Sequence, residues 1–508
     1  MFPGCFLNPT RSSILAALLA WPGLAAAGPA PGLDDLVRTA LAQNLDLQSA
    51  SLEAERAQGG LQAASGLFDP QLGSQLEWNQ LDQNLVNSAG QPVTGTDGYR
   101  KLGLTLSGYT PWSTQYSVAA DSIRRNESRD LVLGDPYDYQ QFQNFPVEWD
   151  NLVKVGITQP LLKGWGSRVA SAPVAKARLQ VSAAQDRIRQ QADRLVADVE
   201  QSYAALELAA WQERSGQASL DRAQRLARRD QERQALELAT RLDALASEQA
   251  VEKRKASLAQ AAQAREDAQT RLLRLVYGSG AGTAMGQVHV VLPEAAGAVP
   301  GVPDLGDEAA CAERAVQQRR NLRAGQEDLE AMRQDLEVAR DNLRPTLSFR
   351  AGYTLQANRN ESSRLTIGNR PFDQAGQGWT VGLVLGVPLF NRAARGAVTQ
   401  VQVDVRRQEL SLQALEQDVR AGVRLALGAI QAARDSLGFA LRAQDLARLH
   451  YEGEVERMEL GLTDSFRVTQ VEEELANAEL ATAQARYDLA KALSVFRFTM
   501  GESAQPYL

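Results

Sequence analysis

The chain presents one arrangement of elements twice. Each half contains alternating segments typical of strands, the last of which runs up to a proline, Pro160 in the first half and Pro388 in the second. Two long alanine-rich helical segments follow in each half, and the second of them ends beside a glycine, Gly278 or Gly501. Few fold classes combine such strands with such long helices, so the duplication narrows the choice of fold before any single residue is considered.

The duplication divides the 508 residues into a leader, two repeats and a linker. Residues 1–27 combine a basic residue with an apolar stretch and end in three alanines, which is typical of a signal peptide. We expect the first repeat at residues 28–278, a linker rich in Gly, Ala and Pro at 279–307, and the second repeat at 308–508. Each repeat would contain a helix, barrel strands and then long helices.

Alternation of apolar with polar or small residues predicts strands of the membrane-spanning type. In the second half, residues 346–356 and 379–389 alternate over about the 9–11 residues that a tilted strand needs to cross a bilayer. Residues 68–78 and 149–161 are their equivalents in the first half. The inserted residues 79–148 include a further hairpin candidate and an exposed loop. We therefore expect four barrel strands per chain, and whether the insertion adds others stays open.

Four strands are too few to close a barrel. The smallest known barrels need about eight strands. An open edge in lipid would leave backbone N–H and C=O groups without hydrogen-bond partners. Three chains would supply twelve strands, so the strand count predicts an oligomer that shares one barrel.

The helical segments carry heptad spacing. Apolar or small residues recur at alternating steps of three and four along residues 412–440 and 468–496, a pattern that favours coiled-coil packing. Residues 167–236 contain no proline after Pro173. One continuous helix over this segment could extend about 100 Å at about 1.5 Å per residue. Such helices fit a tube or a rod better than a globular core.

Several classes of chemistry find no support in the sequence. The formal net charge of −7 argues against nucleic-acid binding, which needs a basic surface. Neither histidine has neighbours at metal-ligand spacing, and no phosphate-binding loop or nucleophile motif occurs. We therefore expect no enzyme activity, no cofactor and no metal. The acidic run Glu472-Glu473-Glu474 is interpreted as a solvated helix face.

With these features in place, the chain resembles the TolC family of outer-membrane channel proteins over essentially all of the sequence after residue 27. The resemblance rests on the duplicated order of strands and helices and on two segments that enter the long helices, QPLL at 159–162 and VPLF at 387–390. It also rests on the tip LGLTDSFRV at 460–468, of which residues 238–245 form a weaker copy.

The resemblance implies a mixed fold: a homotrimer whose shared transmembrane β-barrel is continuous with a long α-helical coiled-coil tunnel in the periplasm. It implies a passive channel in the outer membrane of a Gram-negative-type cell, belonging to a tripartite efflux or type I secretion system. The implied partners are outer-membrane lipid, a periplasmic adaptor (membrane fusion) protein and an inner-membrane transporter. The alternative is a periplasmic coiled-coil scaffold or adaptor without a pore, which would not need strands that face lipid.

The resemblance also implies two hairpin tips that dock on the adaptor. The first-half tip contributes Ala239 and Thr240, and the second-half tip contributes Gly461, Leu462 and Thr463. Glycine at position 461 can adopt a positive φ that a side chain would penalise.

Acidic side chains near these tips constrict the pore in the family. Here Asp243 keeps the first-half acid, whereas Arg467 stands where the family often has aspartate, with Gln470 close behind. We therefore expect a mixed-charge constriction formed by these three residues. The alternative for Arg467 is an ordinary solvated position on a coiled coil. Pro160 and Pro388 would mark the transitions from barrel to tunnel.

Overall fold

In a computed structural model, the chain forms two compact units, each drawing on both sequence halves. Unit 1 comprises Met1–Glu55, Ala183–Gln326 and Leu410–Leu508, and unit 2 comprises Arg56–Ser182 and Glu327–Glu409. The structure describes residues 32–86, 92–132, 140–144, 148–236, 240–278, 306–360, 376–460 and 462–507. The predicted signal peptide and most of the predicted linker lie outside these residues.

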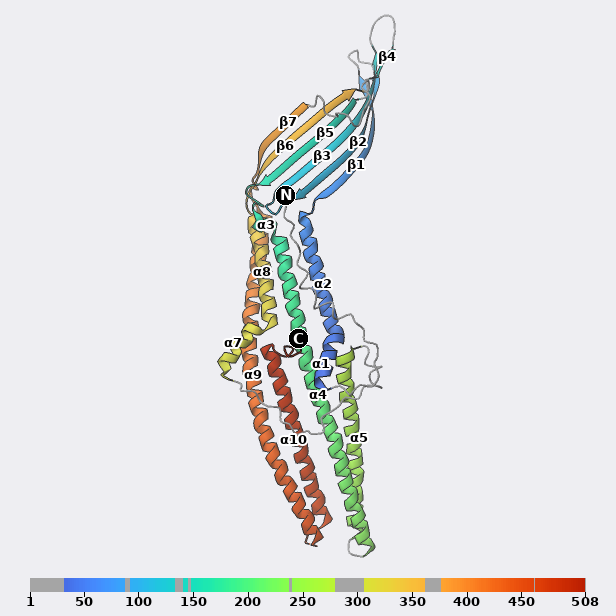
Figure 1. The fold of residues 1–508 in the computed structure, drawn as a ribbon, viewed down its shortest axis with the longest axis vertical. Helices are drawn as coiled ribbons and strands as arrows, with labels where there is room; N and C mark the ends of the chain where they lie inside the picture. The colour runs from blue at the N-terminus through green and yellow to red at the C-terminus, as the bar shows by residue number, and fades with distance from the viewer. Residues whose placement is uncertain are drawn as a thin grey trace. The chain divides into compact units, whose positions relative to one another are not determined.

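Unit 2 contains one antiparallel sheet with the strand order β1-β2-β3-β5-β6-β7, and β4 pairs with the end of β3 (Figure 1). The strands are β1 Gln71–Val86, β2 Pro92–Tyr109, β3 Gln115–Val132, β4 Gln140–Asn144, β5 Glu148–Pro160, β6 Thr346–Asn360 and β7 Gly376–Gly386. The four strands that the duplication predicts are present as β1, β5, β6 and β7. The inserted residues add β2 and β3, which the hairpin candidate anticipated, and the short β4.

One face of this sheet is apolar from edge to edge. Side chains that are directly paired across antiparallel strands share a face, and apolar side chains meet in this way at every strand boundary. The pairs are Leu72 with Leu106, Leu106 with Val118, Val118 with Val155, Val155 with Tyr353, and Tyr353 with Trp379. All six of these side chains are exposed in the single chain. An apolar surface of this extent marks an interface with lipid or protein.

The opposite face is polar. It carries Lys101 and Asp121, which form an ion pair with an N–O distance of 3.5 Å. The Tyr99 hydroxyl donates to Glu77 Oε1 at 2.7 Å on the same face. The predicted alternation thus extends to β2 and β3, which the duplicated pattern does not include.

In unit 2, helices are connected to both ends of the sheet's strands along the chain. A 3-10 turn at Gly66–Phe68 joins α2 (Leu45–Ser65) to β1. Strand β5 is followed by the helices α3 (Ser167–Ala170) and α4 (Ala172–Ala235). Helix α8 (Arg320–Asp341) precedes β6. Ion pairs connect the helices, with Lys176 of α4 bound to Asp335 of α8 at 2.7 Å.

Unit 1 is built from paired long helices. In one pair, α9 (Arg392–Glu459) packs on α10 (Ser465–Met500) through the predicted seam, with Ile430 and Leu437 against Leu489 and Ala492. In the other pair, α4 lies beside α5 (Arg241–Tyr277), with an ion pair between Glu213 and Arg265 at 2.8 Å. The heptad spacing is therefore confirmed as a buried seam in the α9–α10 pair.

Shorter helices complete the core of unit 1. From α1 (Leu33–Gln43), Leu36 packs with Val196 of α4 and Leu272 of α5, and all three side chains are fully buried. Helix α7 (Glu308–Gln318) packs its Cys311 near the end of α10. Among the described helices, none is long and apolar enough to cross a membrane.

Candidate functional site

The turn between α9 and α10 is held by its own backbone and by one cap. Asp464 caps α10, because its side chain accepts a hydrogen bond from the Arg467 backbone N–H at 2.9 Å. The Leu462 N–H donates to the Arg457 carbonyl at 2.9 Å. The Leu462 side chain is 66% exposed and Thr463 is half-buried, so this turn presents an apolar side chain to solvent. Gly461 lies outside the described residues.

The turn between α4 and α5 is described only in part. Thr240 is exposed and precedes α5, whereas Ala239 lies outside the described residues. Asp243 lies in the first turn of α5, but its side chain is likewise outside the description. Its proposed closeness to Arg467 therefore stays a prediction. On α10, Arg467 donates to Gln470 Oε1 at 2.8 Å, so these two predicted constriction residues do lie together.

The two predicted transition prolines lie where strands give way to helices in unit 2. Pro160 is the last residue of β5, and Pro388 lies between β7 and α9. After Pro160, the Leu161 N–H donates to the Leu347 carbonyl at 2.7 Å. After Pro388, Asn391 adopts a positive φ of 44° and its Nδ2 donates to the Leu343 carbonyl at 3.0 Å. The connection after Pro160 is thus tied to the start of β6, and the connection after Pro388 is tied to the segment between α8 and β6.

Glu472 joins the two helical pairs of unit 1, and here the sequence interpretation was wrong. Glu472 is only 6% exposed, not a solvated residue. Its carboxylate accepts from Arg222 of α4 at 3.1 Å, from Arg254 of α5 at 2.6 Å and from the Ser219 hydroxyl at 2.7 Å. One acid on α10 thereby binds both helices of the α4–α5 pair. We call these four residues the Glu472 cluster.

A second ion pair lies beside the cluster at the surface. Lys253 of α5 contacts Glu473 at 3.0 Å, with both side chains substantially exposed. The hydrogen bond from Lys253 holds the pKa of Glu473 below its usual value. In the same region, burial raises the pKa of the Tyr451 phenol, an effect that the nearby Arg222 opposes.

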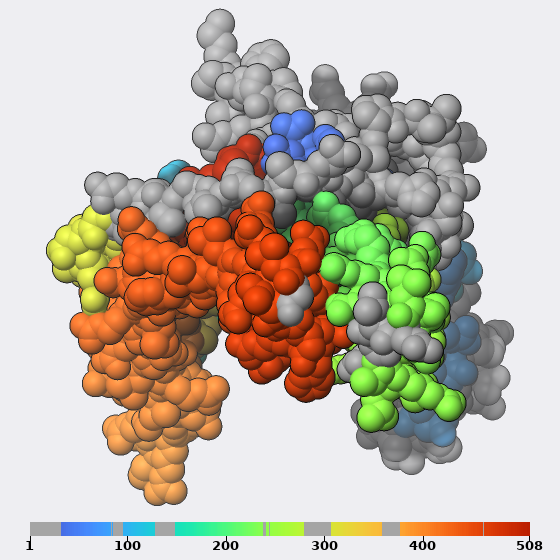
Figure 2. Space-filling model, turned by 90° about the horizontal axis from the view of Figure 1, so that it is seen from below, coloured from blue at the N-terminus to red at the C-terminus, as the bar shows by residue number. Residues whose placement is uncertain are grey.

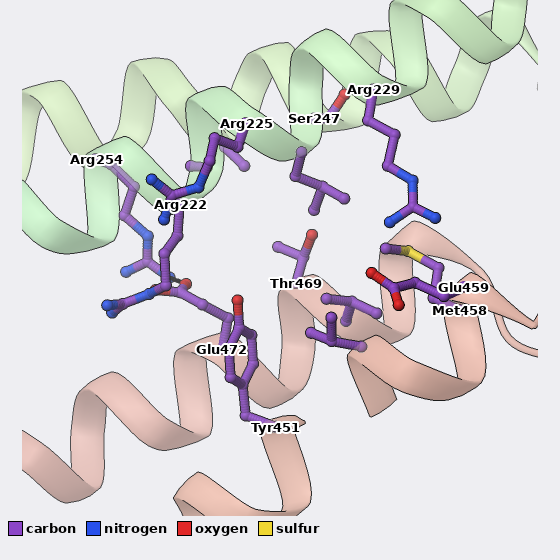
Figure 3. A pocket seen from close by; sticks show the side chains of 15 residues that line it. Arg222, Arg225, Arg229, Ser247, Arg254, Tyr451, Met458, Glu459, Thr469 and Glu472 are labelled. Atoms are coloured by element: carbon purple, nitrogen blue, oxygen red, sulfur yellow. Dashed lines mark hydrogen bonds and ion pairs between the residues drawn. The ribbon is translucent and has the colours of Figure 1, made fainter. Parts of the chain in front are cut away.

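Three residues of the Glu472 cluster, Arg222, Arg254 and Glu472, line part of a cavity of about 280 Å³. Figure 3 shows Tyr451 pointing into this cavity from α9, with Arg225 and Arg229 on the α4 side. Four arginines and two glutamates line the cavity among the described residues, so it carries an excess of positive charge. Seen from below in Figure 2, α5 in green lies next to α10 in orange-red, as the cluster requires.

Sequence reasoning missed the Glu472 cluster, although one signal for it exists. The predicted seam of α10 runs through Val468, Val471 and Leu475, and Glu472 directly follows a seam position. Charged residues that flank a coiled-coil seam commonly form interhelical ion pairs. The sequence does not show which helix supplies the partner, because Arg222 and Arg254 lie 250 and 218 positions away.

Comparison with known proteins shows that part of the chain is similar in sequence to outer-membrane efflux proteins. A family model described as outer membrane efflux protein matches residues 311–502. No curated protein sequence matches the chain significantly.

Solved structures of outer-membrane channels have the same fold. The outer-membrane channel OprN is 17% identical, with a TM-score of 0.66 over 92% of this chain and 90% of that chain. The CmeC outer membrane channel of Campylobacter jejuni is 14% identical, with a TM-score of 0.62 over 93% and 86%. The open-state MtrE outer membrane channel of Neisseria gonorrhoeae is 15% identical, with a TM-score of 0.59 over 93% and 89%. The predicted mixed fold is thereby confirmed.

Proposed function

We propose that this chain, a member of the TolC family of outer-membrane channel proteins, is the outer-membrane duct of a tripartite efflux or type I secretion system. The observation that carries the proposal is the sheet of unit 2, whose apolar face crosses every long strand while β1 and β7 have no partner on their outer edges in the described chain. Such a sheet needs lipid against its apolar face and further strands at its edges.

Further copies of the same chain supply those strands most simply. Three chains would join edge to edge, turn their apolar faces to the outer-membrane lipid and enclose an aqueous bore with their polar faces. The Lys101–Asp121 pair and the neighbouring polar residues of β1 and β2 would then line the bore. A scaffold without a pore would not need a sheet with one apolar and one polar face.

The paired helices of unit 1 would form the periplasmic tunnel. In this proposal the Glu472 cluster holds the α4–α5 pair against the α9–α10 pair and so favours the closed tip. The duct would be passive and not an enzyme, because transport energy would come from an inner-membrane transporter. The tip with exposed Leu462 and half-buried Thr463 would contact the periplasmic adaptor.

Cross-linking and planar-bilayer recording test the proposal together. Purified protein in detergent should give a cross-linking ladder that ends at three chains, and the same preparation should conduct ions in lipid bilayers. A stable monomer inserted in lipid would contradict the shared barrel. Trimers that stay silent even after the Glu472 cluster is disrupted would favour the scaffold without a pore.

A further inference from the structure

The inserted residues 79–148 add strands to the part of the barrel wall that each chain contributes. Resting on the proposed shared barrel, we infer that three copies of this chain close a barrel of eighteen strands, not the twelve that four strands per chain would give. The described residues of each chain form six long strands in one sheet, β1, β2, β3, β5, β6 and β7, so three chains supply eighteen.

The position of the added hairpin in the sheet is the first argument. The β2–β3 hairpin is not attached to an outer edge, because the order β1-β2-β3-β5 places it between two of the predicted barrel strands (Figure 1). Strand β1 pairs with β2 from Gln71 to Val86, and β3 pairs with β5 from Gln115 to Arg125. A twelve-stranded barrel would have to break both of these pairings and join β1 directly to β5.

The side chains of the added strands are the second argument. Leu102, Leu104 and Leu106 of β2 are exposed on the apolar face, level with Leu76, Ser74 and Leu72 of β1. On β3, Val118 and Ala120 continue the same face into Val155 and Val153 of β5. A hairpin that projected into water would gain nothing from this apolar face. A hairpin within the membrane wall requires it.

The strand directions are the third argument. Six consecutive antiparallel strands alternate in direction, so β1 and β7 run in opposite directions at the two edges of the sheet (Figure 1). The β7 edge of one copy can therefore pair with the β1 edge of the next as another antiparallel boundary. All described long strands contain at least the 11 residues of β7, which suffices to cross a bilayer.

The consequence is a wider bore. With strands about 4.8 Å apart and tilted by about 40°, eighteen strands give a wall about 36 Å in diameter, and twelve give about 24 Å. The barrel of this chain should therefore be about 1.5 times as wide as a twelve-stranded one. Any constriction of the channel would then have to be formed by the helices.

Electron microscopy of trimers in lipid nanodiscs measures this diameter directly. We expect end-on views to show a β-wall about 36 Å across. A variant in which an Asn-Gly turn replaces residues 80–147 should contract by about one third, because Asn79 and Glu148 lie at the same height in the sheet. A control deletion of residues 363–372, which removes no residue of the described strands, should leave the diameter unchanged. Wild-type trimers about 24 Å across would overturn the inference while leaving the proposed duct intact.

Cysteine labelling tests the two faces of the hairpin without depending on the deletion. In a Cys311→Ser background, a charged maleimide should label Thr105→Cys and Ala119→Cys at least tenfold faster than Leu104→Cys and Val118→Cys in membrane-inserted trimers. Equal labelling of all four would place the hairpin outside the wall and contradict eighteen strands. Failure to form membrane-inserted trimers at all would contradict the proposed function itself.

Discussion

Glu472→Gln is the perturbation that most sharply tests how the two helical pairs are held together. Glutamine keeps the size of the side chain and can still accept a hydrogen bond from Ser219, but it removes the charge that Arg222 and Arg254 share. Removing one partner of a buried ion pair typically costs about 3–5 kcal/mol. Here the two arginine side chains keep 18% and 16% exposure, so we take the lower end of that range, about 3 kcal/mol.

Amide hydrogen exchange in purified trimers measures this loss as local opening of α10. A cost of about 3 kcal/mol corresponds to exchange about a hundredfold faster in the first turns of the helix. The matched control is Glu473→Gln, which removes the adjacent but exposed pair with Lys253. That pair should contribute less than about 1 kcal/mol, so exchange should change less than about fivefold.

A double-mutant cycle separates the ion pairs from other effects of the substitution. Combined with Arg254→Met, Glu472→Gln should cost clearly less than it does alone, because part of the interaction has already been removed. In planar bilayers, Glu472→Gln should also raise the open fraction of the channel, whereas Glu473→Gln should not. Equal exchange rates in the Glu472→Gln and Glu473→Gln proteins, or strict additivity in the cycle, would refute the claim that Glu472 joins the pairs.

Other residues give three further predictions. Leu489→Ala, at a fully buried seam position, should lower the free energy of unfolding of the helical part by about 2–5 kcal/mol in a denaturant titration; a loss below about 1 kcal/mol would contradict the seam. Gly461→Val should abolish export while trimers still reach the outer membrane; wild-type export would exclude this tip as the docking element. Because the pKa of Glu473 is lowered, its pair with Lys253 should persist at neutral pH and be lost only as pH falls below the ordinary glutamate value of 4.5, as NMR titration can check.

The helical part could be predicted well because its signal is local. Burial along a long helix repeats with the helix period, so Val468, Val471 and Leu475 could be assigned to a seam from spacing alone. The structure buries all three.

The sheet could be predicted in type but not in extent. Strand β1 was expected to end at Trp78, where the alternation stops, yet it continues to Val86. Antiparallel pairing with β2 continues along the added residues, with Asn79 opposite Tyr99 and Val86 opposite Pro92. Backbone pairing does not depend on side-chain alternation, so the sequence pattern contains no signal for it.

The Glu472 cluster could not be predicted from either repeat alone, because it joins them. The acid lies in the second repeat, while Arg222 and Arg254 lie in the first. The two helical pairs are therefore complementary at this point, with the acid on one pair and the arginines on the other. For the proposed duct, each protomer would thus carry its own ionic contact between its two helical pairs. Opening a trimer would break three such contacts. A partner that opens the tip must offset the free energy of breaking them by binding the separated helical pairs more tightly than the joined ones.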